Sequence, residues 1–488
     1  MSAQDLTTPR AKNLALLLLA LTQFVVVIDA SIVNVALPSI GTALDITQDN
    51  LSWVVNSYTL VFGGFLLLGG RLADFFGRRR MFMSGMALFG IASLAGGFAQ
   101  SEEWLIIARA VQGLGAALAS PAALSIVTTT FAEGSERNRA LGIWGAVAGA
   151  GGAAGVLLGG ILTEWAGWEW VLFVNVPIAA FVVWQAPRRL LESREEEESE
   201  RTLDIPGAVS ITAGLAILVY ALVDAAQAGW TSSETLVKGA IGLGLIAAFV
   251  VIELRTRRPL VPFSIFRMRT LRGANVVGIL TGMSLFSMFF MITLYLQQVL
   301  GLDALEAGLA YLPLAIAIIL AAGIAGQLVT RVGYKPVVIT GLLTVSAGLF
   351  WFTQISPDGS FWVDVLGPSL LAGIGLGLTF VPVTIAAMTG TKREEAGLAS
   401  GLINTSQQVG GALGLAILAS VANSATSDSF ADGASRAVAL TDGFSAAFLV
   451  GACFALAGAG LAAILISSKD SREHAEAAQR GEAEMPAA

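Results

Sequence analysis

Long, nearly uncharged stretches are the feature that most restricts the fold of this chain. A helix needs about 20 apolar residues to cross a membrane, and fourteen stretches approach or exceed that length. Only 13% of the 488 residues are charged, against roughly 25% in soluble domains. The sequence therefore predicts an all-α polytopic membrane protein, with spans at Asn13–Leu37, Leu51–Gly70, Met81–Ser101, Trp104–Thr130, Ala140–Thr163, Val171–Pro187, Ile205–Val223, Thr235–Ile252, Gly273–Leu302, Ala307–Thr330, Pro336–Pro357, Val365–Thr391, Ala396–Ser427 and Gly443–Ser468.

The basic residues predict the orientation of these spans. Loops that face the cytoplasm carry an excess of Lys and Arg. With the N-terminus inside, 25 of the 28 Lys and Arg residues fall on the inner side. The three exceptions are Arg109, inside a span, and Lys238 and Arg436 on the outer side. An even number of spans then places both termini in the cytoplasm of a cell that carries the protein in its membrane.

Two charged linkers divide the spans into groups. Glu192–Arg201 is a charge run without apolar periodicity, which predicts a solvated connector, with a regulatory contact as the alternative. Glu253–Arg272 is basic and contains two prolines, so it is expected to lie against anionic inner-leaflet lipid. The predicted organisation is a six-helix bundle (13–187), a charged linker (188–204), two extra spans (205–252), a basic linker (253–272), a second six-helix bundle (273–468) and a tail (469–488).

An internal repeat supports two related halves. The loop Gly70–Arg80 reads GRLADFFGRRR, and a degenerate copy, GQLVTRVGYK, returns at Gly326–Lys335, shifted by 256 residues. Glycines of the fourth and fifth spans also recur, with Gly113 matched by Gly373 at an offset of 260 and Gly151 by Gly410 at 259. Three stretches at nearly one offset predict that the second half repeats the first.

The loop Gly70–Arg80 resembles the signature loop of the major facilitator superfamily of secondary transporters. The resemblance implies the major facilitator fold, here with two inserted helices, and alternating access between two halves related by an axis along the membrane normal. Gly70 and Gly77 permit a tight turn. Asp74 and Arg78 are expected to form a cytoplasmic latch that pairs with helix ends in one state and separates in the other; the alternative is orientation by positive charge alone.

Asp29 is the sharpest candidate for chemistry. It lies in the first span, nine residues before Pro38, so roughly 13 Å below the outer boundary, where a carboxylate must be protonated, paired or hydrated. The stretch around it, VVVIDASIVNVALP, resembles the first-span motif of the fourteen-span drug:proton antiporter branch. That implies a proton-coupling carboxylate, the alternative being a structural ion pair. Arg109, in a stretch like the superfamily's fourth-span motif, is expected at similar depth and would tune Asp29; snorkelling to headgroups is its alternative.

The fifth span carries glycines at four-residue spacing, which lets helices approach closely. Its residues Gly151, Gly155, Gly159 and Gly160 resemble the antiporter motif of drug exporters. One departure is Val156, where the family usually has Pro, so the kink that Pro would impose is not expected here. The stretch Trp168–Pro177, WEWVLFVNVP, also looks like the antiporter branch, although Glu169 stands where a basic residue is common.

Polar and soft side chains within spans are the candidates for substrate contact. Met and aromatic side chains can re-pack around varied apolar molecules, although such stripes are also typical of ordinary helix packing. The spans after residue 273 contain no carboxylate, so a cationic substrate would find its charge partner in the first half. The candidates are Asn34, Gln112, Met283, Phe286, Phe290, Asn404 and Gln408.

The prediction for function is proton-coupled efflux of small hydrophobic or cationic drugs, with membrane lipid as surroundings, no nucleic acid, no metal, and a monomer as the expected state. The proton gradient replaces any cofactor. The alternative is a dedicated exporter, or a proton-coupled importer, of one metabolite. A membrane enzyme is disfavoured because the single His lies in the polar tail. An ATP-driven pump is disfavoured because the chain contains no G-x-x-x-x-G-K-[S/T] loop.

Overall fold

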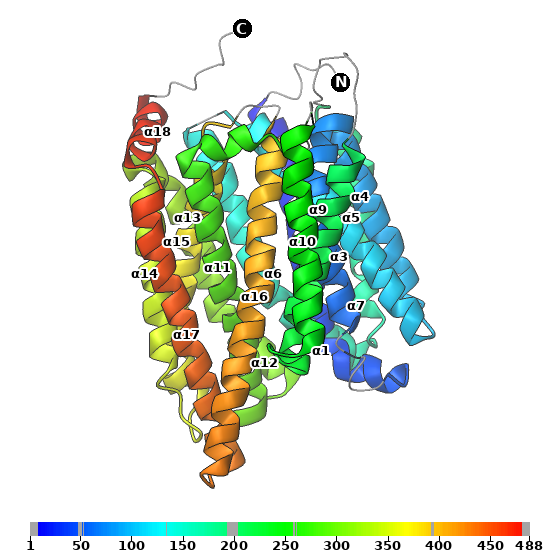
Figure 1. Cartoon of the computed structure of the whole chain (residues 1–488), viewed down its shortest axis with the longest axis vertical. Helices are drawn as coiled ribbons and strands as arrows, with labels where there is room; N and C mark the ends of the chain where they lie inside the picture. Colours follow the sequence, from blue (N-terminus) through cyan, green and yellow to red (C-terminus); the bar gives the residue numbers. More distant parts are fainter. Residues whose placement is uncertain are drawn as a thin grey trace.

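The computed structural model describes residues 8–46, 51, 53–132, 134–192, 204–256, 259, 261–391 and 395–480. Within these ranges the chain is almost wholly helical and contains no strand (Figure 1). The helices are α1 (Pro9–Ala43), α3 (Trp53–Phe76), α4 (Arg78–Gly97), α5 (Glu102–Thr130), α6 (Ser135–Trp165), α7 (Trp170–Phe173), α8 (Asn175–Arg189), α9 (Ile205–Ala228), α10 (Ser233–Arg255), α11 (Arg269–Leu294), α12 (Ala304–Ala310), α13 (Leu312–Val332), α14 (Tyr334–Phe352), α15 (Leu366–Met388), α16 (Ala396–Ala431), α17 (Arg436–Leu465) and α18 (Ser468–Arg480).

Twelve membrane-spanning candidates, each long and apolar enough to cross, occur among the described residues. Two of the fourteen stretches named from the sequence are not among them. One is α4, which opens on three arginines, and the other is α9, whose apolar part is the shorter Pro206–Leu222. Both helices nevertheless run alongside the others in the bundle (Figure 1). The multi-span, all-α class is confirmed, and the count of fourteen stays a prediction.

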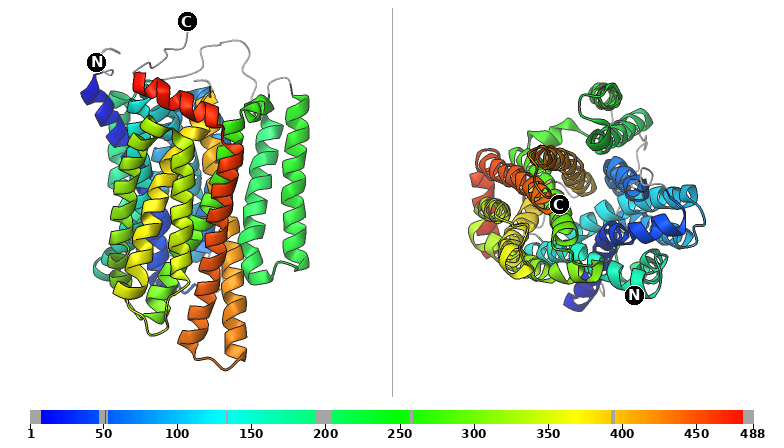
Figure 2. Two further views of the ribbon diagram at one scale, coloured as in Figure 1. Left: turned by 90° about the vertical axis from the view of Figure 1, so that its left-hand side faces the viewer. Right: turned by 90° about the horizontal axis from the view of Figure 1, so that it is seen from below.

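The helices form two groups with α9 and α10 at the edge. Figure 2, seen along the bundle, shows the helices from α1 to α8 on one side and those from α11 to α17 on the other. The pair α9 and α10 stands outside the groups, and α9 packs on both α3 and α16. The first residues of α1 and the whole of α18 lie at the same end of the bundle. This end is called the α18 end below.

Glycines set the close packing, and they do so in equivalent ways in the two groups. A Cβ on Gly115 of α5 would lie 2.8 Å from the carbonyl oxygen of Gly85 in α4. A Cβ on Gly375 of α15 would lie 2.8 Å from the carbonyl oxygen of Gly341 in α14. Any side chain at these positions would push the helices apart. The repeat seen in the sequence therefore corresponds to repeated helix contacts.

The polar tail contains a helix that the sequence did not indicate. Helix α18 packs across the end of the bundle, and its His474 Nε2 lies 3.2 Å from Asn138 Oδ1 of α6. On the same helix, Ser471 Oγ accepts from the Lys335 backbone N–H at 3.0 Å. It thus contacts α6 of the first group and α14 of the second.

Helix ends differ from the expected spans in several places. The sixth span is broken into α7, a single turn, and α8, which begins at Asn175. The last span begins at Arg436, seven residues before the expected Gly443, because Ser435 caps its first turn by accepting from the Val438 N–H. Of the charge run Glu192–Arg201, only Glu192 lies within the described residues.

Candidate proton-coupling and gating sites

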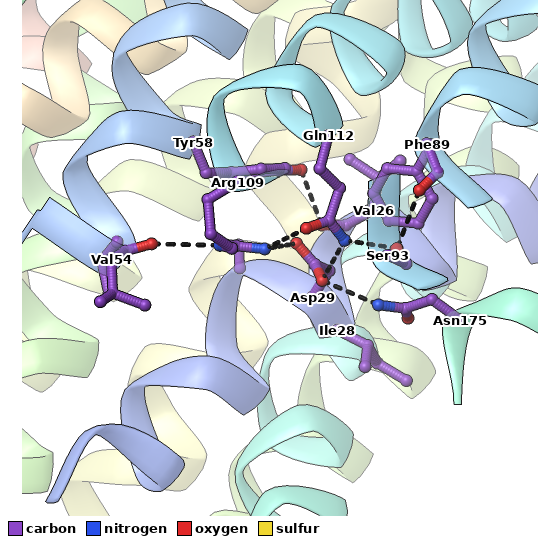
Figure 3. A network of polar contacts seen from close by, with 12 residues as sticks. Val26, Ile28, Asp29, Val54, Tyr58, Phe89, Ser93, Arg109, Gln112 and Asn175 are labelled. Atoms are coloured by element: carbon purple, nitrogen blue, oxygen red, sulfur yellow. Dashed lines mark hydrogen bonds and ion pairs between the residues drawn. The ribbon is translucent and has the colours of Figure 1, made fainter. Parts of the chain in front are cut away.

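Asp29 is held in a buried network of hydrogen bonds inside the first group of helices. Its side chain is fully buried, and its Oδ2 accepts from Arg109 Nη1 at 2.6 Å. Its Oδ1 accepts from Gln112 Nε2 at 2.6 Å and from Asn175 Nδ2 at 2.8 Å (Figure 3). Three donors from α5 and α8 therefore surround a carboxylate of α1. Such pairing and hydrogen bonding compensate the loss of hydration that burial imposes on a charge.

Arg109 contacts other groups besides Asp29. Its Nε donates to the Val54 carbonyl oxygen at 3.1 Å, and its Nη1 also donates to Gln112 Oε1 at 2.6 Å. The guanidinium carbon lies 4.4 Å from the ring centroid of Tyr58, which places the cation over an aromatic face. The side chain is 1% exposed. Snorkelling of Arg109 to headgroups, an alternative left open by the sequence, is therefore excluded in this conformation.

Two members of the network were not singled out from the sequence. Ser93 of α4 accepts from Gln112 Nε2 at 2.8 Å and donates to the Phe89 carbonyl oxygen at 2.8 Å. Asn175 is part of the stretch WEWVLFVNVP, but the sequence alone assigned it no role. The signal that could have found it is a polar side chain at the start of an apolar helix, which must find a partner inside the membrane.

Asp74 joins the two groups of helices at the α18 end. It is 2% exposed, and Arg78 donates to its Oδ1 from Nη2 at 3.0 Å and from Nε at 3.2 Å. The backbone N–H groups of Gly397 and Leu398 donate to its Oδ1 and Oδ2, each at 3.0 Å. These N–H groups belong to the first turn of α16 and have no partner within their own helix. Asp74 therefore caps α16 from another helix, at the end where the dipole favours negative charge.

Glycines at this junction permit the close approach. A Cβ on Gly70 would collide with the carbonyl oxygen of Gly397. Gly77 has φ of +102°, a conformation that favours glycine, and forms the corner between α3 and α4. Glu192 accepts from the Arg79 backbone N–H at 3.2 Å and lies 3.4 Å from the Arg79 guanidinium. The start of the charge run thus contacts the loop that was expected to act as a gate.

The glycines of α6 pack against α1 around the turn that carries Asp29. A Cβ on Gly155 would collide with Ser31 Oγ and would lie 2.8 Å from the Ile28 carbonyl oxygen. A Cβ on Gly159 would lie 2.9 Å from the Ile32 carbonyl oxygen, and one on Gly151 would lie 3.0 Å from Val27 Cβ. Gly160 is also buried.

Val156 stands where the resemblance implied a proline, and its neighbourhood is clear in the structure. Helix α6 runs without a break through this position. Val156 packs in an apolar cluster with residues of the second group, including Tyr311 and Leu314. The side chain therefore contributes to the contact between the two groups.

The candidates for substrate contact fall into different environments. Gln112 is 1% exposed and serves the Asp29 network, so its place among substrate contacts is corrected here. Met283 of α11 is 5% exposed because it lies where α11 packs against α16. The helices are so close at this point that a Cβ on Gly414 of α16 would collide with the backbone of Met283. The side chain of Phe286 lies outside the described part of the structure. The remaining candidates keep exposed surface: Asn34, Phe290, Asn404 and Gln408.

Asp, Glu, Lys and Arg side chains are unevenly distributed inside the protein. Among the described residues the buried ones are Asp29, Asp74, Arg78, Arg109 and Glu253. None belongs to the helices from α11 to α17. Ser369 of α15, the repeat counterpart of Arg109, is 2% exposed and uncharged. Among the described residues, the two halves therefore share their helix packing but differ in their buried charged side chains.

The comparison with protein families identifies the chain. The model of the Major Facilitator Superfamily matches residues 19–415. The chain belongs to this superfamily. It is 42% identical over 453 residues to the cephamycin export protein CmcT of Amycolatopsis lactamdurans, covering 92% of each chain. It is 38% identical over 461 residues to the puromycin resistance protein pur8 of Streptomyces alboniger, covering 93% of this chain and 91% of that relative.

Two solved transporter structures show the same fold. The human organic anion transporter MFSD10 superposes with a TM-score of 0.66 at 15% identity, covering 93% of this chain and all of that one. The proton:xylose symporter XylE superposes with a TM-score of 0.62 at 17% identity, covering 93% and 95% of the two chains. At these identities the likeness concerns the fold alone. The predicted major facilitator fold is confirmed.

Proposed function

We propose that this superfamily member exports small hydrophobic or cationic compounds across the cytoplasmic membrane in exchange for protons. The observation that carries the proposal is the fully buried Asp29, held by three side-chain donors inside the membrane-spanning bundle. Ionisable groups in membrane spans are costly and mark proton or substrate pathways. The relatives CmcT and pur8, named for export and resistance, support efflux as the direction.

In the proposed cycle, Asp29 takes a proton from the outer side, and its ion pair with Arg109 weakens. The α18 end is cytoplasmic, as are both termini. There the contact of Asp74 with α16 keeps the two halves together. Breaking this contact opens the space between the two halves to the cytoplasm, where a compound enters and the proton leaves. Energy comes from the proton gradient, and the transporter works as a monomer without a cofactor.

Asn34, Phe290, Asn404 and Gln408 are the proposed substrate contacts, because each keeps exposed surface in the structure. A narrower specificity is the second candidate. The two relatives are each named for one antibiotic, which favours a dedicated exporter over a broad one.

Everted membrane vesicles test the proposal. With the vesicle interior acidified, a pH-sensitive dye reports protons leaving when a compound is added. A panel of cationic and neutral lipophilic antibiotics is compared in wild type and Asp29→Asn. Proton release that is lost in the variant, at equal protein in the membrane, supports antiport through Asp29. Wild-type proton release in Asp29→Asn contradicts the coupling role. No response to any compound favours the transport of one metabolite.

A further inference from the structure

Within the described part of the chain, the carboxamide of Asn175 forms a hydrogen bond through its nitrogen but not through its oxygen. Its Nδ2 donates to Asp29 Oδ1 at 2.8 Å. Its Oδ1 is buried and accepts no hydrogen bond from any residue in the described part of the chain. Figure 3 shows this oxygen directed away from Asp29. A buried acceptor without a donor costs free energy and calls for an explanation.

The other side chains that contact Asp29 act as donors to it. An arginine donates and cannot accept, so Arg109 can still donate to the carbonyl oxygen of a protonated Asp29 but cannot accept from its O–H. Gln112 Oε1 already accepts from Arg109 Nη1 at 2.6 Å, and its Nε2 is shared between Asp29 and Ser93. When Asp29 takes up a proton, its new O–H therefore meets donors in this arrangement, and among the carboxamides that contact it Asn175 is the one whose oxygen accepts no hydrogen bond from a described residue.

A half-turn of the Asn175 side chain supplies that acceptor. Carboxamide oxygen and nitrogen have nearly the same shape, so the rotation exchanges them without moving the backbone. The outward side of the amide lacks a partner in the present orientation. No hydrogen bond to a described residue therefore has to be broken on the outward side for the carboxamide to rotate. The protonation state of Asp29 then decides which atom faces it.

The backbone around Asn175 suits a fixed pivot. Asn175 is the first residue of α8, directly after the single turn α7. Its side chain is fully buried. Pro177, two residues later in the first turn, has a fixed φ and suits this part of a helix. The rotation of the carboxamide itself needs only the side-chain torsions of Asn175.

We propose that Asn175 is a two-way positioning residue, which donates to Asp29 as a carboxylate and accepts from Asp29 as an acid, and so sets the pH range of exchange. The inference depends on the proposed function, in which Asp29 carries the proton. The proton passes from outer water to a carboxylate oxygen of Asp29 and leaves by the same atom. Asn175 exchanges no proton and rotates with each step.

The test measures compound-induced proton release in everted vesicles across a range of pH. Asn175→Leu removes donor and acceptor at similar volume, and the half-maximal pH is expected to rise by about one unit, because the carboxylate loses the stronger of the two hydrogen bonds. Asn175→Asp is nearly isosteric and places a second carboxylate beside Asp29, so a larger rise is expected. The matched control is Asn275→Leu, another buried asparagine, which contacts Leu271 and Ser406 in the other half.

The outcomes separate this inference from the proposed function. An unchanged half-maximal pH in both Asn175 variants, with only the rate reduced, overturns the two-way role and leaves antiport intact if Asp29→Asn is inactive. Proton release that persists in Asp29→Asn overturns the function on which the inference rests. If Asn175→Leu does not reach the membrane, the Asn175→Asp profile decides: a rise supports the role, and a wild-type profile overturns it.

Discussion

Asp74 of α3 accepts a hydrogen bond from the backbone N–H of Gly397 in α16 at 3.0 Å. A carboxylate from the first half of the chain thus caps a helix of the second half, 323 residues away. The contact needs a glycine on each side, because a Cβ on Gly397 would lie 2.5 Å from Asp74 Oδ1, and one on Gly70 would collide with the Gly397 carbonyl oxygen. Charge, helix dipole and close approach therefore coincide at one junction.

Asp74→Asn is expected to weaken this junction. The amide keeps one acceptor but loses the charge that pairs with Arg78 and with the start of α16. Losing charge-assisted bonds is worth about 1–3 kcal/mol, so the closed form of the α18 end should fall roughly tenfold relative to the open form. The measurement is thiol labelling, in a Cys453→Ser background, of Leu398→Cys at the junction. Arg80→Gln is the control, since that side chain is 67% exposed. Equal labelling of Asp74→Asn and wild type would contradict the latch.

Arg109→Lys tests geometry at constant charge. The guanidinium contacts Asp29, Gln112 and the Val54 carbonyl oxygen at once, which a single ammonium cannot reproduce. Compound-induced proton release is expected to drop at least tenfold while the protein still reaches the membrane. Arg188→Lys, at an exposed site, is the control. Retention of more than half of the wild-type rate would show that charge alone suffices.

The sequence predicted the architecture well because membrane insertion leaves few choices. Apolar length, basic loops and recurring glycines follow from the cost of exposing polar groups to lipid and from helix packing. The repeat also predicted equivalent backbone conformations, since Gly77 and Gly333, 256 residues apart, both have positive φ. Asp29 and Arg109 were expected at similar depth, and the structure joins them at 2.6 Å.

What the sequence did not predict depends on which way a side chain points. Gln112 was a substrate candidate because it is polar and lies in a span, yet it turns toward Asp29. Ser93 and Asn175 complete the network from helices far away in the sequence, and no periodicity signals that meeting. Helix α18 is polar in composition, so only its packing against Lys335 and Asn138 shows that it belongs to the bundle.

Removing α18 is expected to lower thermal stability. Truncation after Ser467 would lose the bonds of Ser471 and His474 and expose the surface that Ala475 and Ala478 cover. A loss of about 1–2 kcal/mol corresponds to a melting temperature lower by about 2–5 °C, measured in detergent. Removal of 481–488 alone, which leaves α18 whole, is the control. If the truncated protein and the wild type had the same melting temperature, the packing of α18 would not stabilise the protein.

Gly155→Ala tests how closely α1 must approach α6 beside Asp29. The new methyl would collide with Ser31 Oγ and lie 2.8 Å from the Ile28 carbonyl oxygen, so the helices must separate. Overpacking of this kind costs about 1–3 kcal/mol, and a shift of α1 also displaces Asp29 from Arg109. Both melting temperature and proton release are expected to fall.

Two further variants sharpen the Gly155 test. Gly323→Ala is the matched control, because a Cβ there meets nothing within 4 Å, and Ala is the better helix former. Adding Ser31→Gly to Gly155→Ala removes the side-chain collision but leaves the backbone contact with Ile28, so recovery should be partial. Full recovery would place the whole effect on Ser31 and show that the helix backbones tolerate the methyl. An unchanged melting temperature and unchanged proton release in Gly155→Ala would show that α1 and α6 can accommodate a methyl group beside Asp29.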